Sequence, residues 1–254
     1  MTLIKQDKVA FVGRQHLHFT SINSTNNFFS DFEAVKVDQY SFTVSTDFQT
    51  DGVGQRGNFW ESEICKNLLF TIYTFPKFFE TNNLFAINKI VSISILEILQ
   101  ELDVKDVTIK WPNDILVGNK KIAGILLKNS IQGQFVKSLG IGIGLNVNQE
   151  KFSQFERKAT SLKIEKGVIL DRFKILEAIK KRINKYYKLL ISNSTVLNEL
   201  YLKNLYQFDE WHSYLINGNQ KKAKIVGVNK DGDLNLNTFE GESLKVGIKE
   251  IVFL

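Results

Sequence analysis

The sequence predicts an α+β fold with a larger domain over residues 1–208 and a small β-barrel domain over residues 209–254. In the larger domain, apolar runs of strand length alternate with longer runs of helical periodicity. Beyond residue 208, short alternating strands are joined by the turn sequences Asp231-Gly232 and Glu240-Gly241. A barrel of about 45 residues builds little core of its own, so we expect it to lean on the larger domain.

The elements of the larger domain follow from periodicity and capping residues. Ser24-Thr25-Asn26 is a good N-terminal cap, so a helix is expected to begin there, and Asn82 and Asp171 are expected to cap two further helices. The helix after Asn82 has apolar residues on more than one face, which predicts burial, whereas residues 170–190 form an amphipathic pattern. The expected strands cover residues 14–19, 40–48, 68–75, 107–111, 122–127 and 135–147, and those of the barrel cover residues 224–228, 234–237 and 244–248.

Composition restricts the classes of protein to which the chain can belong. Its net charge is +6 and its pI is about 9.2, but the lysines are scattered, which favours a solvated surface over a nucleic-acid site. A single cysteine, Cys65, excludes an internal disulfide framework. The first residues show no secretory apolar stretch, and polar residues interrupt the apolar segment 84–99. We therefore expect a soluble cytoplasmic protein that binds neither membrane nor nucleic acid.

The stretch 110–127 is the most informative part of the chain. It begins with the polar tip Lys110-Trp111-Pro112-Asn113-Asp114, and an apolar strand follows that contains Lys121 and Gly124. A lysine entering such a strand can place a fixed cation in a dry pocket, and the glycine lets a ligand approach the backbone. The alternative is that Lys121 is an exposed turn lysine beside Lys120. The functional interpretation predicts a site for a small anionic ligand.

Two glycine-containing segments add to this pattern. The loop 51–60 combines glycines with Arg56 and Trp60, so its backbone can wrap around an anion and its indole can stack on a ring. The same loop, taken alone, is equally compatible with a plain surface loop, and it matches neither a dinucleotide fingerprint nor a P-loop. In the strand 135–147, alternate glycines leave one face without side chains, which serves either a flat ligand or tight packing.

Four motifs in this order carry a resemblance to a known family. They are Ser24-Thr25-Asn26; Gln49 with Gly52-x-Gly54-x-Arg56-Gly57-x-x-Trp60; Lys110-Trp111-Pro112-Asn113-Asp114 with Lys121-Ile122-Ala123-Gly124-Ile125-Leu126; and Gly142-x-Gly144-x-Asn146. The chain closely resembles the biotin protein ligases (biotin–acetyl-CoA-carboxylase ligases) over essentially its whole length. The resemblance implies a mixed β-sheet flanked by helices, related to class II aminoacyl-tRNA synthetases, followed by an SH3-like β-barrel.

The resemblance also implies an activity. Members of the family join biotin and ATP into biotinyl-5'-adenylate with release of pyrophosphate, then pass the biotinyl group to one lysine of a biotin carboxyl carrier protein or domain of a carboxylase. ATP and Mg²⁺ would act as substrate and activator, and no tightly bound prosthetic group is implied. The partner would be the carrier, and the sequence leaves open whether the chain is a monomer or a homodimer.

The residues carried over from the family fall into three groups. Lys121, Arg56 and Asp114 are the catalytic candidates, and Asp114 is either a magnesium ligand or a proton acceptor. The biotin-binding candidates are Ser24, Thr25, Asn26, Gln49, Gly52, Gly54, Lys121, Gly124, Gly142 and Gly144. The candidates for binding ATP and the adenylate are Gln55, Arg56, Gly57, Asn58, Trp60, Lys110, Asn113, Lys121 and Asn146, and segment 149–162 is expected to close over the adenylate.

The sequence departs from the family in two respects. Val53, Gln55 and Asn58 stand where many relatives have basic residues, which puts the retention of the adenylate in doubt. Only 23 residues precede Ser24, so we expect a short form without an N-terminal DNA-binding domain. The alternatives are a lipoate or octanoate ligase or transferase, which shares the fold and the pocket lysine, and a biotin-sensing DNA-binding protein.

Overall fold

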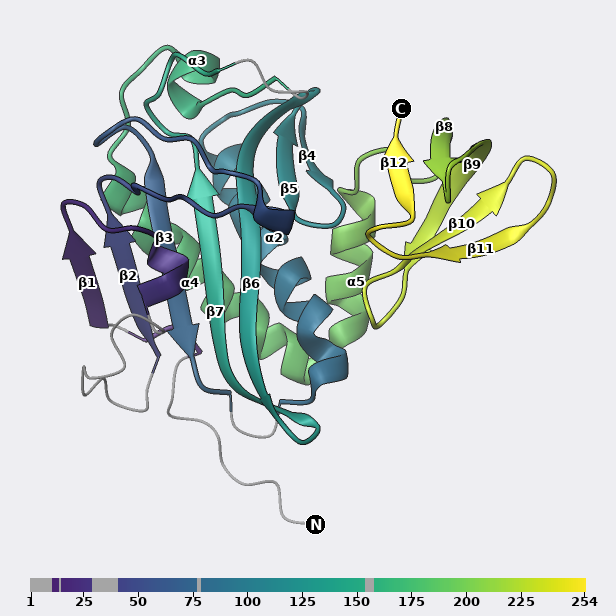
Figure 1. Cartoon of the computed structure of the whole chain (residues 1–254), viewed down its shortest axis with the longest axis horizontal. Helices are drawn as coiled ribbons and strands as arrows, with labels where there is room; N and C mark the ends of the chain where they lie inside the picture. Colours follow the sequence, from purple (N-terminus) through teal and green to yellow (C-terminus); the bar gives the residue numbers. More distant parts are fainter. Residues whose placement is uncertain (1–10, 14, 29–40, 77–78, 154–157) are drawn as a thin grey trace.

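The computed structural model describes residues 11–13, 15–28, 41–76, 79–153 and 158–254, and the side chain of Arg56 lies outside this description. The described chain forms a seven-stranded sheet with helices and a separate five-stranded C-terminal sheet (Figure 1). Strand β1 pairs with β2 in parallel, and the remaining pairs of the larger sheet are antiparallel. The predicted mixed sheet is therefore confirmed.

The larger sheet has the order β1-β2-β3-β7-β6-β5-β4. Its strands are β1 (Gln15–Phe19), β2 (Phe42–Thr46), β3 (Leu68–Thr74), β4 (Val107–Lys110), β5 (Asp114–Val117), β6 (Lys120–Gln132) and β7 (Phe135–Leu145). The sequence did not separate β5 as a strand, because the tip at residues 111–113 reverses the chain within three residues. That reversal places the tip at the end of the β4–β5 hairpin.

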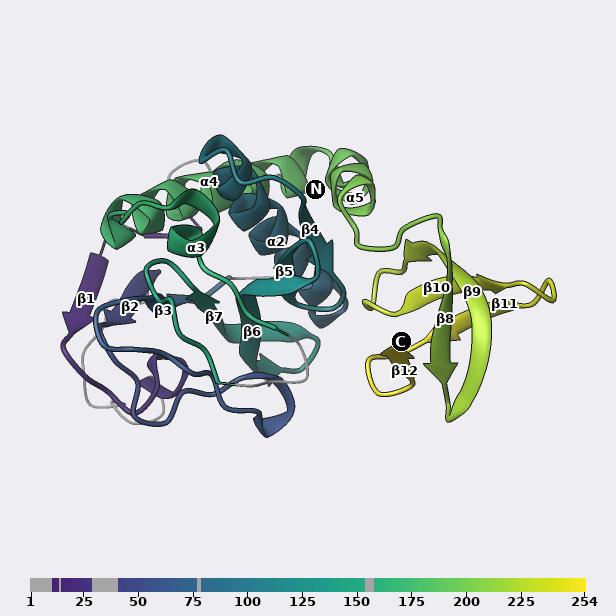
Figure 2. The ribbon, with the colours of Figure 1, turned by 90° about the horizontal axis from the view of Figure 1, so that it is seen from above.

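The helices lie on one face of this sheet. They are α2 (Leu84–Glu101), α3 (Leu162–Lys166), α4 (Arg172–Ser192) and α5 (Ser194–Lys203), and the 3-10 turns are η1 (Thr25–Asn27), η2 (Gln55–Gly57) and η3 (Thr81–Asn83). Seen from above, α2 and α4 cover the same face, whereas η1 and the loop that carries η2 lie on the opposite face (Figure 2). The opposite face is therefore the one that can be open to a ligand.

Helix α2 is the central helix of the core. It has apolar residues on more than one face. Together with η3 it is, by length and composition alone, long and apolar enough to cross a membrane. Twelve of its eighteen residues are buried in the protein, as the dense apolar pattern predicts. Helix α2 packs against α4 and against the underside of the sheet, and so forms the main hydrophobic layer.

Two of the three capping predictions are confirmed, and the one for Asn82 is wrong. Asn82 lies inside η3, and the residue before α2 is Asn83, whose side chain makes no capping hydrogen bond. The side chain of Asp171 accepts hydrogen bonds from the backbone N–H groups of Phe173 and Lys174 at the start of α4. Ser24 caps η1 by accepting from the N–H of Asn26. The continuation of a helix after Asn26 falls largely on residues 29–40, outside the described residues. Helix α5, whose N-cap is Asn193, was not predicted from the sequence.

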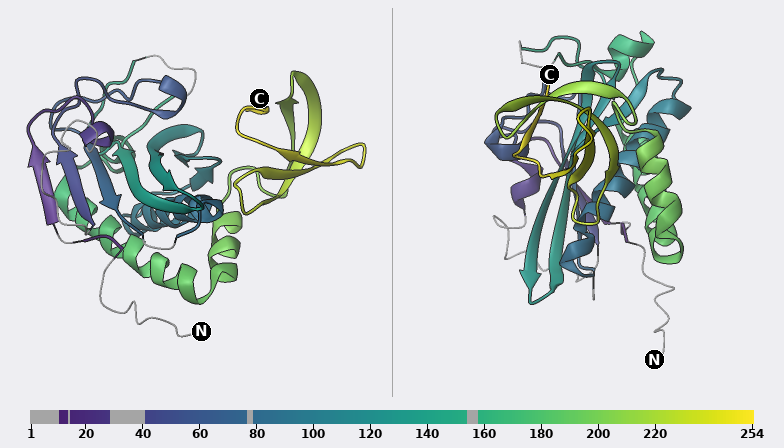
Figure 3. Two further views of the ribbon diagram at one scale, coloured as in Figure 1. Left: turned by 60° about the horizontal axis from the view of Figure 1, so that its bottom comes forward. Right: turned by 90° about the vertical axis from the view of Figure 1, so that its right-hand side faces the viewer.

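The C-terminal part of the chain forms a separate five-stranded antiparallel sheet, called the barrel below. Its strands are β8 (Trp211–Ile216), β9 (Asn219–Val228), β10 (Leu234–Thr238), β11 (Ser243–Val246) and β12 (Ile251–Phe253), in the order β11-β10-β9-β8-β12. Gly232 and Gly241 have φ angles of +99° and +91°, as the two predicted turns require. The barrel lies beside the β4–β5 end of the large sheet (Figure 3), and its buried residues join the core of the larger domain.

One buried lysine makes the packing of α2 against α5 sensitive to pH. Lys89 is 8% exposed, its Nζ lies 2.7 Å from Asn198 Oδ1, and it lies over the rings of Phe85 and Tyr201. Burial lowers the pKa of Lys89 to about 8. Between about pH 8 and the ordinary lysine pKa the unfolded chain binds more protons than the folded one, so stability rises with pH in that window.

We expect Lys89→Met to raise the free energy of unfolding at pH 7 and to flatten its pH dependence. In the native chain the rise is at most about 1.4 kcal/mol per pH unit, the value of one proton. Urea unfolding at pH 7, 8, 9 and 10 measures both effects, with Lys203→Met, an exposed change in α5, as the control. Equal pH dependence in the native chain and in Lys89→Met would contradict the prediction.

Candidate functional site

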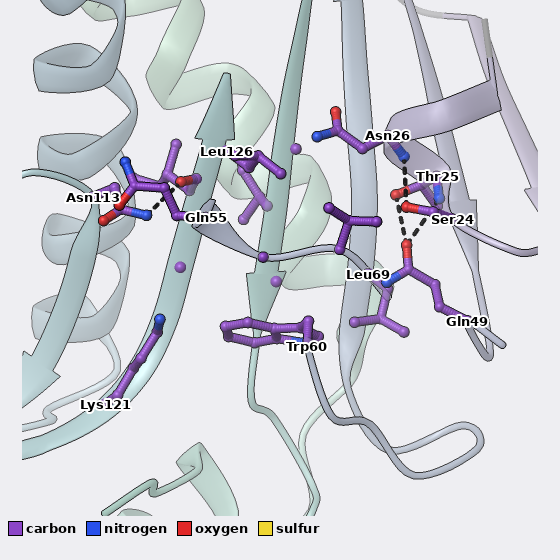
Figure 4. Close-up of a pocket in the computed structure, with 17 residues that line it drawn as sticks. Ser24, Thr25, Asn26, Gln49, Gln55, Trp60, Leu69, Asn113, Lys121 and Leu126 are labelled. Carbon is purple, nitrogen blue, oxygen red and sulfur yellow. Dashed lines mark hydrogen bonds between the residues drawn. The ribbon is translucent and has the colours of Figure 1, made fainter. Parts of the chain in front are cut away.

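A pocket lies on the open face of the sheet, above β6 and β7, and its empty space is about 430 Å³ including the mouth (Figure 4). Predicted site residues that line it are Ser24, Thr25, Asn26, Gln49, Gly54, Gln55, Trp60, Asn113, Lys121, Gly124, Gly142 and Gly144. The structure thus brings together segments that lie more than one hundred residues apart in the sequence.

One end of the pocket is a rigid polar cluster around Thr25. The backbone N–H of Thr25 donates to Gln49 Oε1 at 2.8 Å, and its hydroxyl donates to the same oxygen at 3.1 Å. Thr71 donates to the Thr25 hydroxyl, and Tyr73 donates to the Thr25 carbonyl. Because Gln49 Oε1 is occupied by two donors, its amide orientation is fixed, and its NH₂ group is the part left to bind a ligand.

Asn26 adds an acceptor to this end. Its Oδ1 atom is buried and has no hydrogen-bond partner among the described residues. A Cβ atom built on Gly142 would lie 3.0 Å from Asn26 Cγ, so the amide lies directly on the glycine face of β7. A buried acceptor without a donor costs about 1–3 kcal/mol, which a ligand N–H group in the pocket would offset.

The floor of the pocket is formed by glycines. Gly124 of β6 faces Gly144 of β7 in the antiparallel register. Cβ atoms built on these glycines would lie 2.9 Å and 2.4 Å from the nearest ring atoms of Trp60. The indole of Trp60 therefore lies against the backbone of these two strands, in space that the side chain of any other residue at Gly124 or Gly144 would fill (Figure 4). The glycine stripe thus serves both of the predicted purposes: it allows Trp60 to pack tightly on the sheet, and it forms the floor of the pocket.

The other end of the pocket carries a fixed cation. Lys121 Nζ lies 2.7 Å from Asp114 Oδ1 and 5.3 Å from the centroid of the Trp60 ring. The lysine side chain is 30% exposed, so the ammonium reaches the pocket and is still held by a neighbouring carboxylate. Lys121 is thus part of the pocket, and its interpretation as a plain surface lysine is excluded.

The strand that carries Lys121 is braced from both sides. Asn113 Nδ2 donates to the carbonyl of Ile125, and the N–H of Ile125 donates to the carbonyl of Asn113, both at 2.9 Å. On the other side, the N–H of Lys121 donates to the carbonyl of Lys158, and Thr160 donates back to the carbonyl of Lys121. These paired backbone bonds fix the position from which the ammonium extends.

Glu165 anchors the segment that contains Thr160. Burial alone would raise the pKa of the Glu165 carboxyl, but hydrogen bonds from Lys120 and Thr160 outweigh it and hold that pKa below its ordinary value. The carboxylate therefore stays ionised at neutral pH and keeps its ion pair with Lys120. A second link joins this side to the glycine-rich loop, since Glu61 accepts hydrogen bonds from the N–H and hydroxyl of Ser153.

The structure does not bring every predicted residue to the pocket lining. Lys110 lies with its Nζ 4.9 Å from the ring of Phe253 in the barrel. Asn146 is buried beside the pocket, donates to the carbonyl of Thr160, and has an Oδ1 atom that lacks a partner in the described part of the chain. Residues Gly52, Gly57 and Asn58 shape the loop hairpin instead, and the side chain of Arg56 and residues 154–157 lie outside the described residues.

Sequence reasoning missed the apolar part of the lining. Val53, Leu69, Ile125, Leu126 and Ile143 also line the pocket. Leu69 belongs to a strand that was predicted, but nothing in its pattern separates a pocket-facing apolar residue from a core residue, and Ile125 and Ile143 also belong to the buried core. The assembled pocket has hydrogen-bonding groups at one end, a flat apolar middle and an ammonium at the other end. It suits an elongated molecule with a polar head and an anionic tail.

Comparison with known proteins gives a consistent family. The model of the "Biotin/lipoate A/B protein ligase family" matches residues 18–148. The chain is 27% identical to the bifunctional ligase/repressor BirA of Bacillus subtilis over 211 residues, which are 78% of this chain and 62% of that protein. It is 30% identical to biotin–protein ligase 2 of Arabidopsis thaliana over 62% of this chain and 49% of that protein. The chain thus spans less than two thirds of the length of these curated relatives.

Solved structures resemble the chain over more of its length. A biotin protein ligase from Aquifex aeolicus, in complex with biotin and ATP, has a TM-score of 0.79 and 26% identity, and the match covers 95% of this chain and 99% of that one. A biotin protein ligase from Leishmania major, in complex with biotinyl-5-AMP, has a TM-score of 0.66 over 92% and 99% of the two chains. At 21% identity, the second likeness shows the fold alone.

We expect Gly144→Ala to push the Trp60 indole off the pocket floor, because the new methyl group would lie 2.4 Å from Cε2 of the ring. The emission of Trp60, taken as the difference between each protein and its Trp60→Phe version, should shift to the red as the indole becomes exposed. Gly140→Ala, on the same face but with its nearest neighbour at 3.2 Å, is the control. An unchanged difference spectrum in Gly144→Ala would contradict the packing described here.

Proposed function

The chain belongs to the biotin/lipoate A/B protein ligase family, and from that premise we propose that it is an ATP-dependent biotin–[acetyl-CoA-carboxylase] ligase. It would activate biotin to biotinyl-5'-AMP and transfer the biotinyl group to a lysine of a biotin carboxyl carrier protein or domain. The observation that carries the proposal is the pairing of two features in one pocket. A fixed ammonium, Lys121, stands at one end, and Asn26 Oδ1, which has no hydrogen-bond partner in the described part of the chain, stands at the other.

The shape of biotin fits that arrangement. Its ureido ring has two N–H donors and one carbonyl acceptor, its valeryl chain is apolar, and its carboxylate is anionic. We place the ureido ring at the polar end, where Asn26 Oδ1 accepts from an N–H and the NH₂ of Gln49 donates to the carbonyl. The valeryl chain then follows the glycine floor beside Trp60, and the carboxylate reaches Lys121.

The polar end also favours biotin over lipoate. The dithiolane ring of lipoate has no N–H donor, so it would cover Asn26 Oδ1 and leave that acceptor unsatisfied, at a cost of about 1–3 kcal/mol. Calorimetric titration with biotin and with lipoate tests this choice directly. Tight lipoate binding without biotin binding would replace the proposed substrate with the alternative one.

The first step joins two anions. The biotin carboxylate oxygen attacks the α-phosphorus of ATP, the bond to the bridging oxygen breaks, and pyrophosphate leaves. Lys121 offsets the repulsion between carboxylate and phosphate and stabilises the charge that develops on the phosphoryl oxygens. Asp114 holds the lysine ammonium in place through their ion pair. Holding both substrates in line supplies up to about 7–11 kcal/mol of the barrier reduction.

Magnesium is the expected activator of this reaction, and we tested its fit on the residues present. The Asp114 carboxylate is already paired with Lys121 at 2.7 Å, and the described residues contain no group of three or more His, Cys, Asp or Glu side chains placed to hold a metal ion. A magnesium role for Asp114 therefore stays a prediction that this geometry does not favour.

The second step transfers the biotinyl group. The carrier lysine amine attacks the acyl carbon of the mixed anhydride, the bond to the phosphate oxygen breaks, and AMP leaves. Excluding water from the anhydride requires closure over the adenylate. We assign this closure to the glycine-rich loop and segment 149–162, which already meet through the Glu61–Ser153 hydrogen bonds. The use of ATP agrees with the cytoplasmic location that the sequence predicts.

We expect Lys121→Ala to lower the rate of pyrophosphate release from biotin and ATP by about 10²–10³, the typical effect of removing one group that stabilises developing charge. A coupled pyrophosphate assay measures the rate, and circular dichroism checks that the fold is retained. The matched control is Lys128→Ala, an exposed lysine on the same strand β6 that lies outside the pocket lining.

Two outcomes of that assay would count against the proposal. Near-normal turnover in Lys121→Ala would show that another group bridges carboxylate and phosphate. An equal loss of activity in Lys128→Ala would show that the strand tolerates no substitution, and the effect could not then be assigned to the pocket ammonium.

A further inference from the structure

The turn between β9 and β10 of the barrel is fastened to the polar tip of the large sheet. The indole Nε1 of Trp111 donates to the backbone carbonyl of Gly232 at 2.7 Å. Trp111 is 3% exposed, so this hydrogen bond is buried, and it joins residues 121 positions apart. A buried indole N–H without an acceptor would be costly, so the barrel turn completes the environment of the tip.

The turn leaves no space for a side chain at its apex, Gly232. Gly232 has a φ angle of +99°, and a Cβ atom there would lie 2.5 Å from a ring carbon of Phe85 in the first turn of α2. Asn229 holds the apex from inside the turn, since its Oδ1 accepts from the N–H groups of Gly232 and Asp233. The apex is therefore a rigid element that touches α2 and Trp111 together.

The tip that receives this contact also supports the pocket. Asn113, two residues after Trp111, forms paired bonds with Ile125, and Asp114 holds the ammonium of Lys121. Strands β4 and β5 are only four residues long and β4 is the edge strand of the sheet, so their own ladder gives the tip limited support. An anchor from outside the sheet therefore matters more here than in the centre of the sheet.

We propose that the barrel is a positioning element for the pocket lysine, and that Trp111 and Gly232 are the positioning residues that transmit its support to Asn113, Asp114 and Lys121. The proposal rests on the proposed function for its catalytic consequence, but the mechanical link stands independently of the substrate. Neither Trp111 nor Gly232 lines the pocket, so their effect on the reaction is exerted through the tip.

The test is Trp111→Phe, which removes the N–H donor and keeps an aromatic ring. We expect kcat for pyrophosphate release to fall about 10–100-fold, the scale of a small displacement of a reacting group, with KM for biotin changed less than about twofold because the polar end lies on other strands. Trp211→Phe is the matched control, since Trp211 is 43% exposed on the barrel and packs on Phe239.

Hydrogen exchange supplies a readout that does not depend on the substrate. In Trp111→Phe, we expect amide exchange to rise about tenfold in peptides covering residues 229–233 and residues 113–127, with no change in β2 and β3. Gly232→Ala acts from the barrel side and should raise exchange in the same two peptides and lower kcat in the same way. It also keeps the test decisive if Trp111→Phe fails to fold.

The results separate the two proposals. Faster exchange at 229–233 with unchanged exchange at 113–127 and unchanged kcat would overturn the positioning role, because the barrel could then loosen without disturbing the pocket. If the native chain binds no biotin and releases no pyrophosphate, the proposed function fails, whereas the exchange measurement still decides whether the barrel holds the tip.

Discussion

The antiparallel pairing of β6 with β7 is the constraint on which the site depends. Its register places Gly124 opposite Gly144, and the absence of both side chains creates a floor deep enough for an indole to lie on backbone. A register shift of one residue would turn these glycines toward α2 and raise apolar side chains into the pocket. The helices on the other face keep the pair from shifting, since Ile125, Ile141 and Ile143 are buried. The core thus fixes the register, and the register fixes the pocket.

The polar groups around this floor are arranged at its two ends. Thr25 and the Oε1 atom of Gln49 are held by their hydrogen bonds to each other, and Thr25 also bonds to Thr71 of β3, so both side chains keep their orientation before a ligand arrives. Asn26 Oδ1 accepts no hydrogen bond from the residues that the structure describes, and Lys121 is left partly exposed. Preorganised groups of this kind spend little energy on reorganisation when a ligand binds. This preorganisation lowers the stability of the ligand-free protein, because Asn26 Oδ1 has no partner among the described residues and the ion pair of Lys121 with Asp114 is partly buried.

How far the sequence predicted this arrangement depended on the kind of signal. Ser24, Lys121 and the glycines were found because a cap, a cation in an apolar strand and a period-two stripe each follow from local chemistry, whereas Gln49 was named only through the family resemblance. Lys110 was placed by the same motif, yet its side chain lies against the barrel, because its position is decided by a domain that begins a hundred residues later. Helix α5 and strands β8 and β12 lacked distinct local patterns. The apolar lining residues could not be told from core residues, since only the folded sheet decides which face is covered.

The contact between the tip and the barrel explains why the informative motif includes a tryptophan that does not reach the pocket. Asn113 and Asp114 act on the strand that carries the lysine, whereas Trp111 points away and is buried against the barrel turn. A short edge hairpin that must hold a charged pair needs support on the side opposite to the ligand. The barrel provides it through one carbonyl at a left-handed glycine, where a side chain would collide with Phe85. The motif therefore has two roles: Asn113 and Asp114 support the pocket lysine, and Trp111 packs the tip against the barrel.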